Sequence, residues 1–127
     1  MFVEDFIHHI YEEEDTLFHY IRLLNNTWMH KLYHGKLYFE MEKYALQQFA
    51  LEHSTQDDEM SGIRSITHDY DMTNMQNLHL KVVFAELQAF EKELMVHAKI
   101  EDEVLFPKAL NLEKAVKHMF ASKVHLN

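Results

Sequence analysis

Two ten-residue segments of this chain repeat one pattern of histidine, acidic and apolar residues. Residues 9–18 read HIYEEEDTLF, and residues 97–106 read HAKIEDEVLF. Each segment begins with a histidine, has a glutamate four residues later and ends in Leu-Phe. Residues four apart lie on one face of an α-helix, so His9 with Glu13, and His97 with Glu101, can direct an imidazole and a carboxylate to one point. The repeat therefore predicts two helices of similar design, each carrying half of a metal site.

The composition favours helices and restricts the kinds of metal ligand. The chain has 127 residues with only two Gly and one Pro, so few residues interrupt a helix, and we predict an all-α fold. This length suits one hydrophobic core, and residues 1–127 are expected to form a single domain. The absence of Cys excludes disulfides, thiolate ligands and thiol catalysis, so His and carboxylates must hold any metal ion.

The charge and hydropathy of the chain restrict its partners. The formal net charge of −9 argues against a nucleic-acid partner, because phosphate backbones are bound by clusters of Lys and Arg. No apolar run reaches the roughly 18 to 20 residues that cross a bilayer, and the start, MFVED, lacks the basic region of a secretory signal. We therefore expect a soluble, cytoplasmic protein with no membrane partner. The high density of His, 11 residues, is the one compositional feature that points to chemistry.

Helical periodicity predicts three long helices and one short one. The first should cover residues 2–24 and end in the turn residues Asn25, Asn26 and Thr27, and the second should run from residue 36 into the sixties, where Ser61 and Gly62 bend or end it. The third should cover about residues 75–106 and stop or kink at Pro107, before a short helix at about residues 112–124. The polar residues 54–59 are expected to form a solvated face.

The apolar positions of these helices form stripes that include the His and Glu of the repeat. The predicted inward positions are Phe2, Phe6, His9, Glu13 and Leu17 in the first helix, Ala45, Phe49, His53, Met60 and Ile63 in the second, and Val83, Leu87, Phe90, Leu94, His97, Glu101 and Leu105 in the third. The first and third stripes match residue by residue, which suggests two helices related by a pseudo-twofold axis around a shared centre.

A shared centre with two carboxylates can hold two metal ions. Each carboxylate can bridge the ions while His nitrogens complete the separate shells, and bundle cores provide such ligands from facing helices. Nitrogen and oxygen ligands suit iron or manganese and do not exclude zinc. His53, preceded by Glu52, is the best candidate for a further ligand. The alternative is a structural network in which buried His and Glu satisfy one another. Two copies of the motif favour metal, because buried carboxylates without a cation are costly.

The repeat also resembles the signature of a known family. Both copies are similar to the H-x-x-x-E-E/D-x-x-L-F signature of the hemerythrin-like, or HHE cation-binding, proteins, and most closely to the di-iron proteins associated with iron-sulfur cluster repair. In that signature Leu-Phe-Pro is common, and the second copy reads Leu105-Phe106-Pro107. The pair Glu52-His53 looks like the Glu-His that opens the third helix of the family's bundle. The resemblance covers about residues 2–110.

The resemblance implies a four-helix bundle around a bridged di-iron centre. By position it makes His9, His53 and His97 terminal ligands and makes Glu13 and Glu101 bridging carboxylates. The implied cofactor is two iron ions, and the implied roles are iron-sulfur cluster repair in a stress response or the handling of oxygen or nitric oxide. A different class of function is also open, namely a non-catalytic module that senses or binds a metal or gas, or a helical interaction domain with an incomplete site.

One departure from the family leaves the predicted metal shell short of ligands. In the family a helix with its own His ligands precedes the first H-x-x-x-E helix, and only eight residues precede His9 here. We therefore expect a truncated or C-terminal portion of such a domain. The short last helix could fold back and supply His118 or His125, a second copy could complete the bundle, or the site could stay partly filled. A homodimer is favoured, because three amphipathic helices leave an apolar groove.

Overall fold

The computed structural model describes residues 2–31, 35–43, 46–55 and 58–125, and every regular element in this part of the chain is a helix. The elements are α1 (Phe2–Glu12), the π-helix η1 (Glu13–Phe18), α2 (His19–His30), α3 (Gly35–Lys43), α4 (Leu46–Thr55), α5 (Ser61–Ile66), α6 (Leu78–Ile100), the π-helix η2 (Glu101–Leu105) and α7 (Phe106–His125). The predicted all-α class is confirmed. Across the described residues, no helix is both long and apolar enough to cross a membrane.

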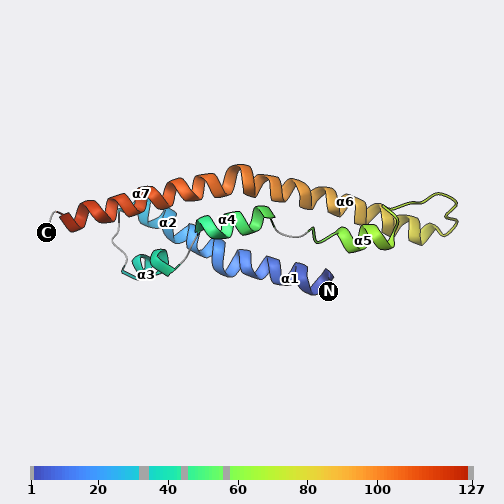
Figure 1. Cartoon of the computed structure of the whole chain (residues 1–127), viewed down its shortest axis with the longest axis horizontal. Helices are drawn as coiled ribbons and strands as arrows, with labels where there is room; N and C mark the ends of the chain where they lie inside the picture. Colours follow the sequence, from blue (N-terminus) through green and yellow to red (C-terminus); the bar gives the residue numbers. More distant parts are fainter. Residues whose placement is uncertain (1, 32–34, 44–45, 56–57, 126–127) are drawn as a thin grey trace.

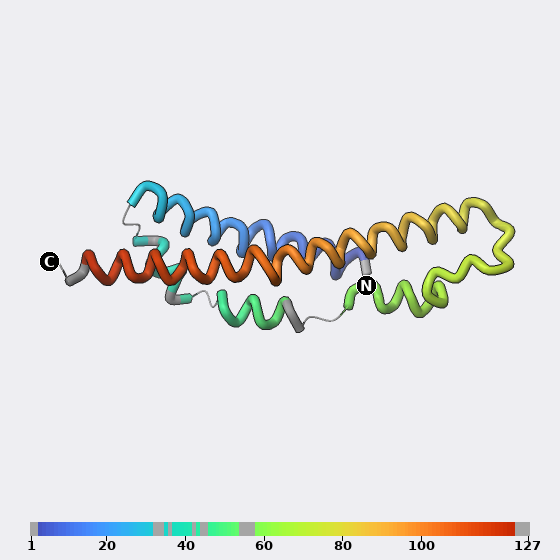
Figure 2. The backbone as a smooth tube through the Cα atoms, turned by 90° about the horizontal axis from the view of Figure 1, so that it is seen from above, coloured from blue at the N-terminus to red at the C-terminus, as the bar shows by residue number. Residues whose placement is uncertain are grey.

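The helices form two long rods with a returning segment beside them (Figure 1). The first rod consists of α1, η1 and α2, and the long rod consists of α6, η2 and α7. Both rods run in the same direction along the molecule, and α4 and α5 run back in the opposite direction beside them (Figures 1 and 2). This up, down, up course brings the two repeated segments side by side, because each lies in the middle of a rod.

The hydrophobic core lies on the α2 and α7 side of the two π-helices. It joins α2, α3, α4 and α7, and its fully buried side chains are Leu17, Leu24, Leu37, Leu46 and Val116. One polar pair is buried with them: the Tyr20 hydroxyl donates to Glu113, whose other oxygen accepts from Lys117 Nζ at 3.1 Å. The hydrophobic core therefore borders the repeated His and Glu residues.

The first rod is longer than the sequence predicted. Asn25, Asn26 and Thr27 do not form a turn but lie within α2, and the Thr27 side chain is buried. The helix ends instead at Lys31, which has a left-handed backbone (φ 52°) and places Nζ 3.4 Å from the centre of the Trp28 ring. The turn prediction was wrong because burial of one helix face outweighed the local preference of Asn and Thr for turns.

The returning segment is divided into shorter helices than the sequence predicted. It contains α3, α4 and α5, and residues 44–45 and 56–57, which include the predicted core residue Ala45, lie outside the described residues. Ser61 and Gly62 begin α5 and do not end a helix. Of the predicted inward positions, Phe49, His53 and Ile63 are partly buried and Met60 is buried.

The long rod continues through Pro107, where the sequence predicted an end or a kink. The separate short helix expected at residues 112–124 is instead part of α7. Pro107 is the second residue of α7, and Phe106 separates it from the end of η2. A proline is tolerated in the first turn of a helix because its missing N–H has little use there. The π-helix therefore provides a helix start inside the rod.

The first half of α6 is less buried than its periodicity predicted. No residue of α6 is fully buried, and Val83, a predicted core residue, is 49% exposed. Asn77 caps this helix by accepting hydrogen bonds from the backbone N–H groups of His79 and Leu80. In both views the start of α6 extends past the free end of α1, with only α5 and the following loop beside it (Figures 1 and 2).

Candidate metal centre

Both copies of the repeat change from an α-helix to a π-helix at the equivalent position, the Glu that follows the His by four residues. In the first rod η1 begins at Glu13, and in the long rod η2 begins at Glu101. Two successive spacings of four, as from His9 to Glu13 to Leu17, would drift by about 80° on a regular α-helix. A wider π turn rotates less per residue and so reduces this drift. The π turn therefore keeps the His, the Glu and the following Leu on the inner face. Such π turns inside helices are often found at functional sites.

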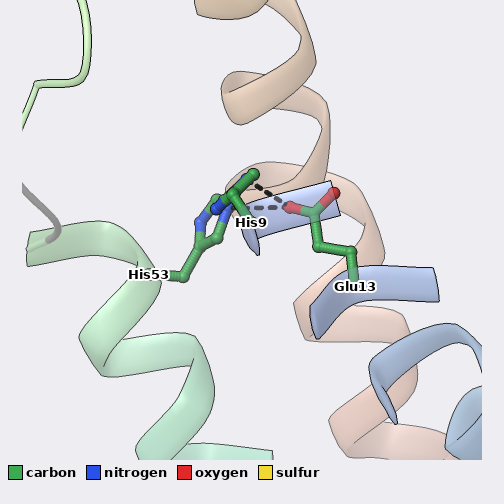
Figure 3. Close-up of side chains that lie close together, drawn as sticks. All are labelled: His9, Glu13 and His53. Carbon is green, nitrogen blue, oxygen red and sulfur yellow. Dashed lines mark ion pairs between the residues drawn. The ribbon is translucent and has the colours of Figure 1, made fainter. Parts of the chain in front are cut away.

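The first group of candidate ligands joins the first rod to α4. His9, Glu13 and His53 each offer an atom within 4.8 Å of the others. His9 Nε2 lies 2.6 Å from Glu13 Oε1, and His53 Nε2 lies 3.6 Å from the same oxygen. Figure 3 shows both rings facing this oxygen, while the other carboxylate oxygen points away from them. We call this place the inner position.

The second group joins the two rods across the molecule. Glu13, His97 and Glu101 also offer atoms within 4.8 Å of one another. His97 Nε2 contacts Glu101 Oε1 and lies 3.5 Å from Glu13 Oε2, the oxygen that faces away from the inner position. We call this place the outer position. Glu13 therefore belongs to both groups and offers one oxygen to each.

Glu101 divides its oxygens in the same way as Glu13. Its Oε2 lies 2.7 Å from His53 Nε2, on the inner side, and its Oε1 contacts His97 Nε2, on the outer side. Two carboxylates thus lie between two sets of imidazole nitrogens. Among the described residues the sets are unequal, because the inner position has His9 and His53 and the outer position has only His97. The His53 side chain is only 6% exposed, whereas the His97 side chain is 51% exposed.

The protonation of the cluster follows from burial and from these contacts. Burial by itself would raise the pKa of Glu13, but the imidazoles of His53 and His9 outweigh it and hold that pKa below its usual value. The Glu101 and Glu13 carboxylates raise the pKa of His53 to about 10, although burial opposes them. At neutral pH the metal-free cluster therefore contains an ionised Glu13 beside a protonated His53.

The buried carboxylate oxygens fit a bound cation. Glu13 Oε1 and both oxygens of Glu101 are buried and accept no hydrogen bond of regular geometry from the residues that the structure describes, even though imidazole nitrogens approach them closely. Buried polar atoms nearly always have partners, and an orphaned carboxylate oxygen is costly. Nitrogen and carboxylate atoms that converge in this way are the donor set of a divalent metal site. The five residues predicted from the sequence as ligands are therefore brought together.

Two acidic residues near the cluster were not predicted as part of it. Asp102 Oδ1 lies 3.0 Å from His53 Nδ1, the nitrogen that faces away from the carboxylates. Glu59 Oε1 lies 3.6 Å from His9 Nδ1. Glu59 belongs to the stretch expected to form a solvated face, but its side chain is mostly buried, and burial raises its pKa. Glu59 is far from His9 in the sequence, so no local pattern predicted their contact. Asp102, in contrast, directly follows the predicted ligand Glu101.

Of the two histidines near the end of the chain, His118 does not reach the centre. His118 is exposed on α7, and a helix that continues straight from Glu101 places it about 25 Å away along the rod axis. The alternative in which the last helix folds back to lend His118 is therefore excluded, since α7 extends away from the site (Figure 1). The side chain of His125, the other tail candidate, lies outside the described residues.

A cavity of about 480 Å³ opens beside the cluster. His9, His53 and His97 are among the residues that line it. Its other walls come from α5, α6 and the segment before α5, and they include Glu59, Met60, Arg64, Glu91 and Leu94. Arg64 is ion-paired with Asp58 and Glu91, so its charge is already neutralised. The cavity gives a small molecule a route from solvent to the imidazoles.

Comparisons with models of protein families, with curated proteins and with solved structures found no match for this chain.

Proposed function

We propose that this chain is a non-haem metal-binding protein that holds two metal ions, one at the inner and one at the outer position. The observation that carries this proposal is the division of each carboxylate between the two positions. Glu13 Oε1 and Glu101 Oε2 face His9 and His53, while Glu13 Oε2 and Glu101 Oε1 face His97. Two bridging carboxylates with His nitrogens at each end are the ligand arrangement expected of a dinuclear centre.

Iron is the metal we propose for this centre. The donors are nitrogen and oxygen only, which suits iron or manganese and also accommodates zinc. The resemblance of both repeats to the hemerythrin-like signature supports iron, and with it a role in iron-sulfur cluster repair or in handling oxygen or nitric oxide. A pair of iron ions bound there would supply redox chemistry towards a small ligand. The cavity beside His9, His53 and His97 would admit such a ligand.

One observation favours a second candidate function, a module that binds or senses a metal without catalysis. Within the described parts of the chain, the outer position has a single His, His97, and that side chain is half exposed. An ion there would be held mainly by the two shared carboxylates. We therefore expect the inner position to bind its metal more tightly than the outer position. If only the inner position fills, the protein is a mononuclear binding module.

We also propose that a second copy of the chain covers the open side of the centre. An apolar groove of about 250 Å³ lies between α2 and the long rod, and it is lined mainly by Ile21, Ile100, Val104, Leu105, Ala109 and Leu112. The groove borders η2, so a helix of the partner placed there would lie close to the half-exposed His97. This packing would complete a bundle of the four-helix type.

The proposed function is tested by metal content after anaerobic purification and reloading with ferrous iron. Two irons per chain are expected in the wild type. His97→Ala should lose about one iron, and Glu13→Ala combined with Glu101→Ala should lose both, because both carboxylates serve both positions. The optical bands of the iron-loaded protein in air should disappear in the double variant.

The chain contains a matched control on the same helix. His8 and Glu12 have the same spacing of four, with His8 Nε2 3.2 Å from Glu12 Oε1, but both side chains are exposed. His8→Ala combined with Glu12→Ala should therefore leave the iron content at two. A helical protein that binds no iron, or that loses iron equally in the two double variants, would refute the proposal.

A further inference from the structure

The imidazole of His53 is held at both of its nitrogens by consecutive residues of η2. Its Nε2 lies 2.7 Å from Glu101 Oε2, and its Nδ1 lies 3.0 Å from Asp102 Oδ1. On a regular α-helix, neighbouring residues point about 100° apart. The smaller rotation per residue of the π-helix helps both acids to face α4. One side chain of α4 is thus held between two adjacent acids of the long rod.

The packing around His53 leaves its ring little freedom. Its ring centre lies 5.2 Å from that of Phe106 and 5.6 Å from that of His9. The side chain is 6% exposed, whereas Asp102 is 36% exposed at the edge of the site. Asp102 therefore contacts the ring from the solvent side, while the carboxylates of Glu13 and Glu101 contact it from the inside.

We propose that Asp102 is a positioning residue that fixes the tautomer of His53 and aims its Nε2 at the metal. A neutral imidazole has one N–H and one free lone pair. If Nδ1–H donates to Asp102, the lone pair is left on Nε2, which faces Glu13 and Glu101. Carboxylates that accept from the second nitrogen of a metal-bound His orient the ring and raise its basicity. This inference rests on the proposed metal centre and adds a residue that does not itself touch the metal.

The repeat supplies an internal comparison for this role. Glu14 occupies the position in η1 that Asp102 occupies in η2, directly after the shared Glu. The Glu14 side chain is exposed on the first rod, and it is Glu59 whose Oε1 lies 3.6 Å from His9 Nδ1. Both copies therefore have an acidic residue after the shared Glu, Glu14 in the first and Asp102 in the second. A contact with a His is shown for Asp102.

The test measures Zn²⁺ affinity by competition with a chelator. A site of nitrogen and oxygen donors binds Zn²⁺ more tightly than Fe²⁺, so Zn²⁺ is a stringent probe of whether the site exists. Asp102→Ala should weaken binding by roughly 10 to 100-fold, the range typical for the loss of such a partner. Asp102→Asn, which keeps an acceptor oxygen, should lie between Asp102→Ala and the wild type. Glu14→Ala should change affinity less than about twofold.

A second measurement separates positioning from a general effect on folding. In the Zn²⁺-loaded wild type, ¹⁵N spectra of the His rings should show His53 protonated at Nδ1, with that proton protected from exchange. In Asp102→Ala the protection should be lost while the helical content by circular dichroism is unchanged. Wild-type affinity and a still protected Nδ1 proton in Asp102→Ala would overturn the inference alone. Failure of the wild type to bind Zn²⁺ would overturn the metal centre as well.

Discussion

At the scale of single residues, His53 controls the charge of the metal-free cluster. The carboxylates of Glu101 and Glu13 raise its pKa to about 10, so a metal ion must displace a proton from it at neutral pH. Glu13, in contrast, is already ionised, because its pKa is held below the usual value. Metal binding should therefore release a proton, and the proton comes from a residue at the inner position.

This protonation predicts how the stability of the metal-free protein depends on pH. The folded-state pKa of His53 is raised from 6.5 to about 10, so its charge stabilises the fold fully below pH 6.5. That contribution should be lost as the pH rises through about 10. The unfolding temperature of the metal-free wild type should therefore fall between pH 7 and pH 10, as measured by circular dichroism.

The control for this prediction is His53→Gln, which cannot carry the charge. Its unfolding temperature should change less over the same pH interval, since other titrating groups are common to both proteins. A wild type whose stability is flat or rises from pH 7 to pH 10, relative to His53→Gln, would contradict the assignment of this proton to His53.

At the scale of elements, burial differs sharply along the helices. Leu24 of α2 is fully buried in the core, whereas Val83 of α6 is half exposed, although both lie on apolar helix faces. The difference arises because α2 packs against α7 while the start of α6 extends past the first rod (Figures 1 and 2). Periodicity identifies the face of a helix that would be buried, but not whether another helix lies opposite.

Truncation of these two side chains should therefore have very different effects. Leu24→Ala should lower the free energy of unfolding by about 2–5 kcal/mol, because it leaves a cavity in the core. Val83→Ala should change it by less than about 0.5 kcal/mol, as for other exposed positions. Urea unfolding followed by circular dichroism measures both values. Equal losses would show that α6 is buried in solution, against a partner.

At the scale of the whole molecule, part of the exposed apolar surface lies in the groove between α2 and the long rod. Ile100 and Val104 line it and are both about half exposed, next to the outer position of the metal centre. Exposed apolar patches on a helical surface are typical of interaction sites. A symmetric dimer would bury the same patch on both copies.

The dimer makes a direct prediction for the mass in solution. Sedimentation of the wild type should give twice the 15.3 kDa of one chain, and Val104→Glu should give a single chain. Salt of about 0.15 M should be present, because it screens the repulsion between chains of net charge −9.

Ile66→Glu provides the matched control for the mass measurement. Ile66 lies on α5, outside the groove, and is 79% exposed. The control variant should remain dimeric. A wild type that sediments as one chain at high concentration would exclude this dimer.

Much of the candidate site was predictable because its signal is local. The spacing of His9 and Glu13, and of His97 and Glu101, fixes which residues share a helix face, and the apolar stripes orient that face inwards. The same stripes indicated His53. The π-helices were not predictable, since they depend on fitting each Glu between two rods. Asp102 was visible only as a second acid beside Glu101, and Glu59 gave no signal.

The sequence by itself determined that the chain is helical, that it has no thiol ligands and that two helices each present a His and a Glu to a core. Those features follow from composition and from contacts within one turn. The tertiary structure decided which nitrogen faces which oxygen, that Asp102 reaches His53, that the rods pass through Asn25 and Pro107, and that His97 stays open. Each of these depends on which group packs opposite, and residues distant in the chain determine that only once the fold has formed.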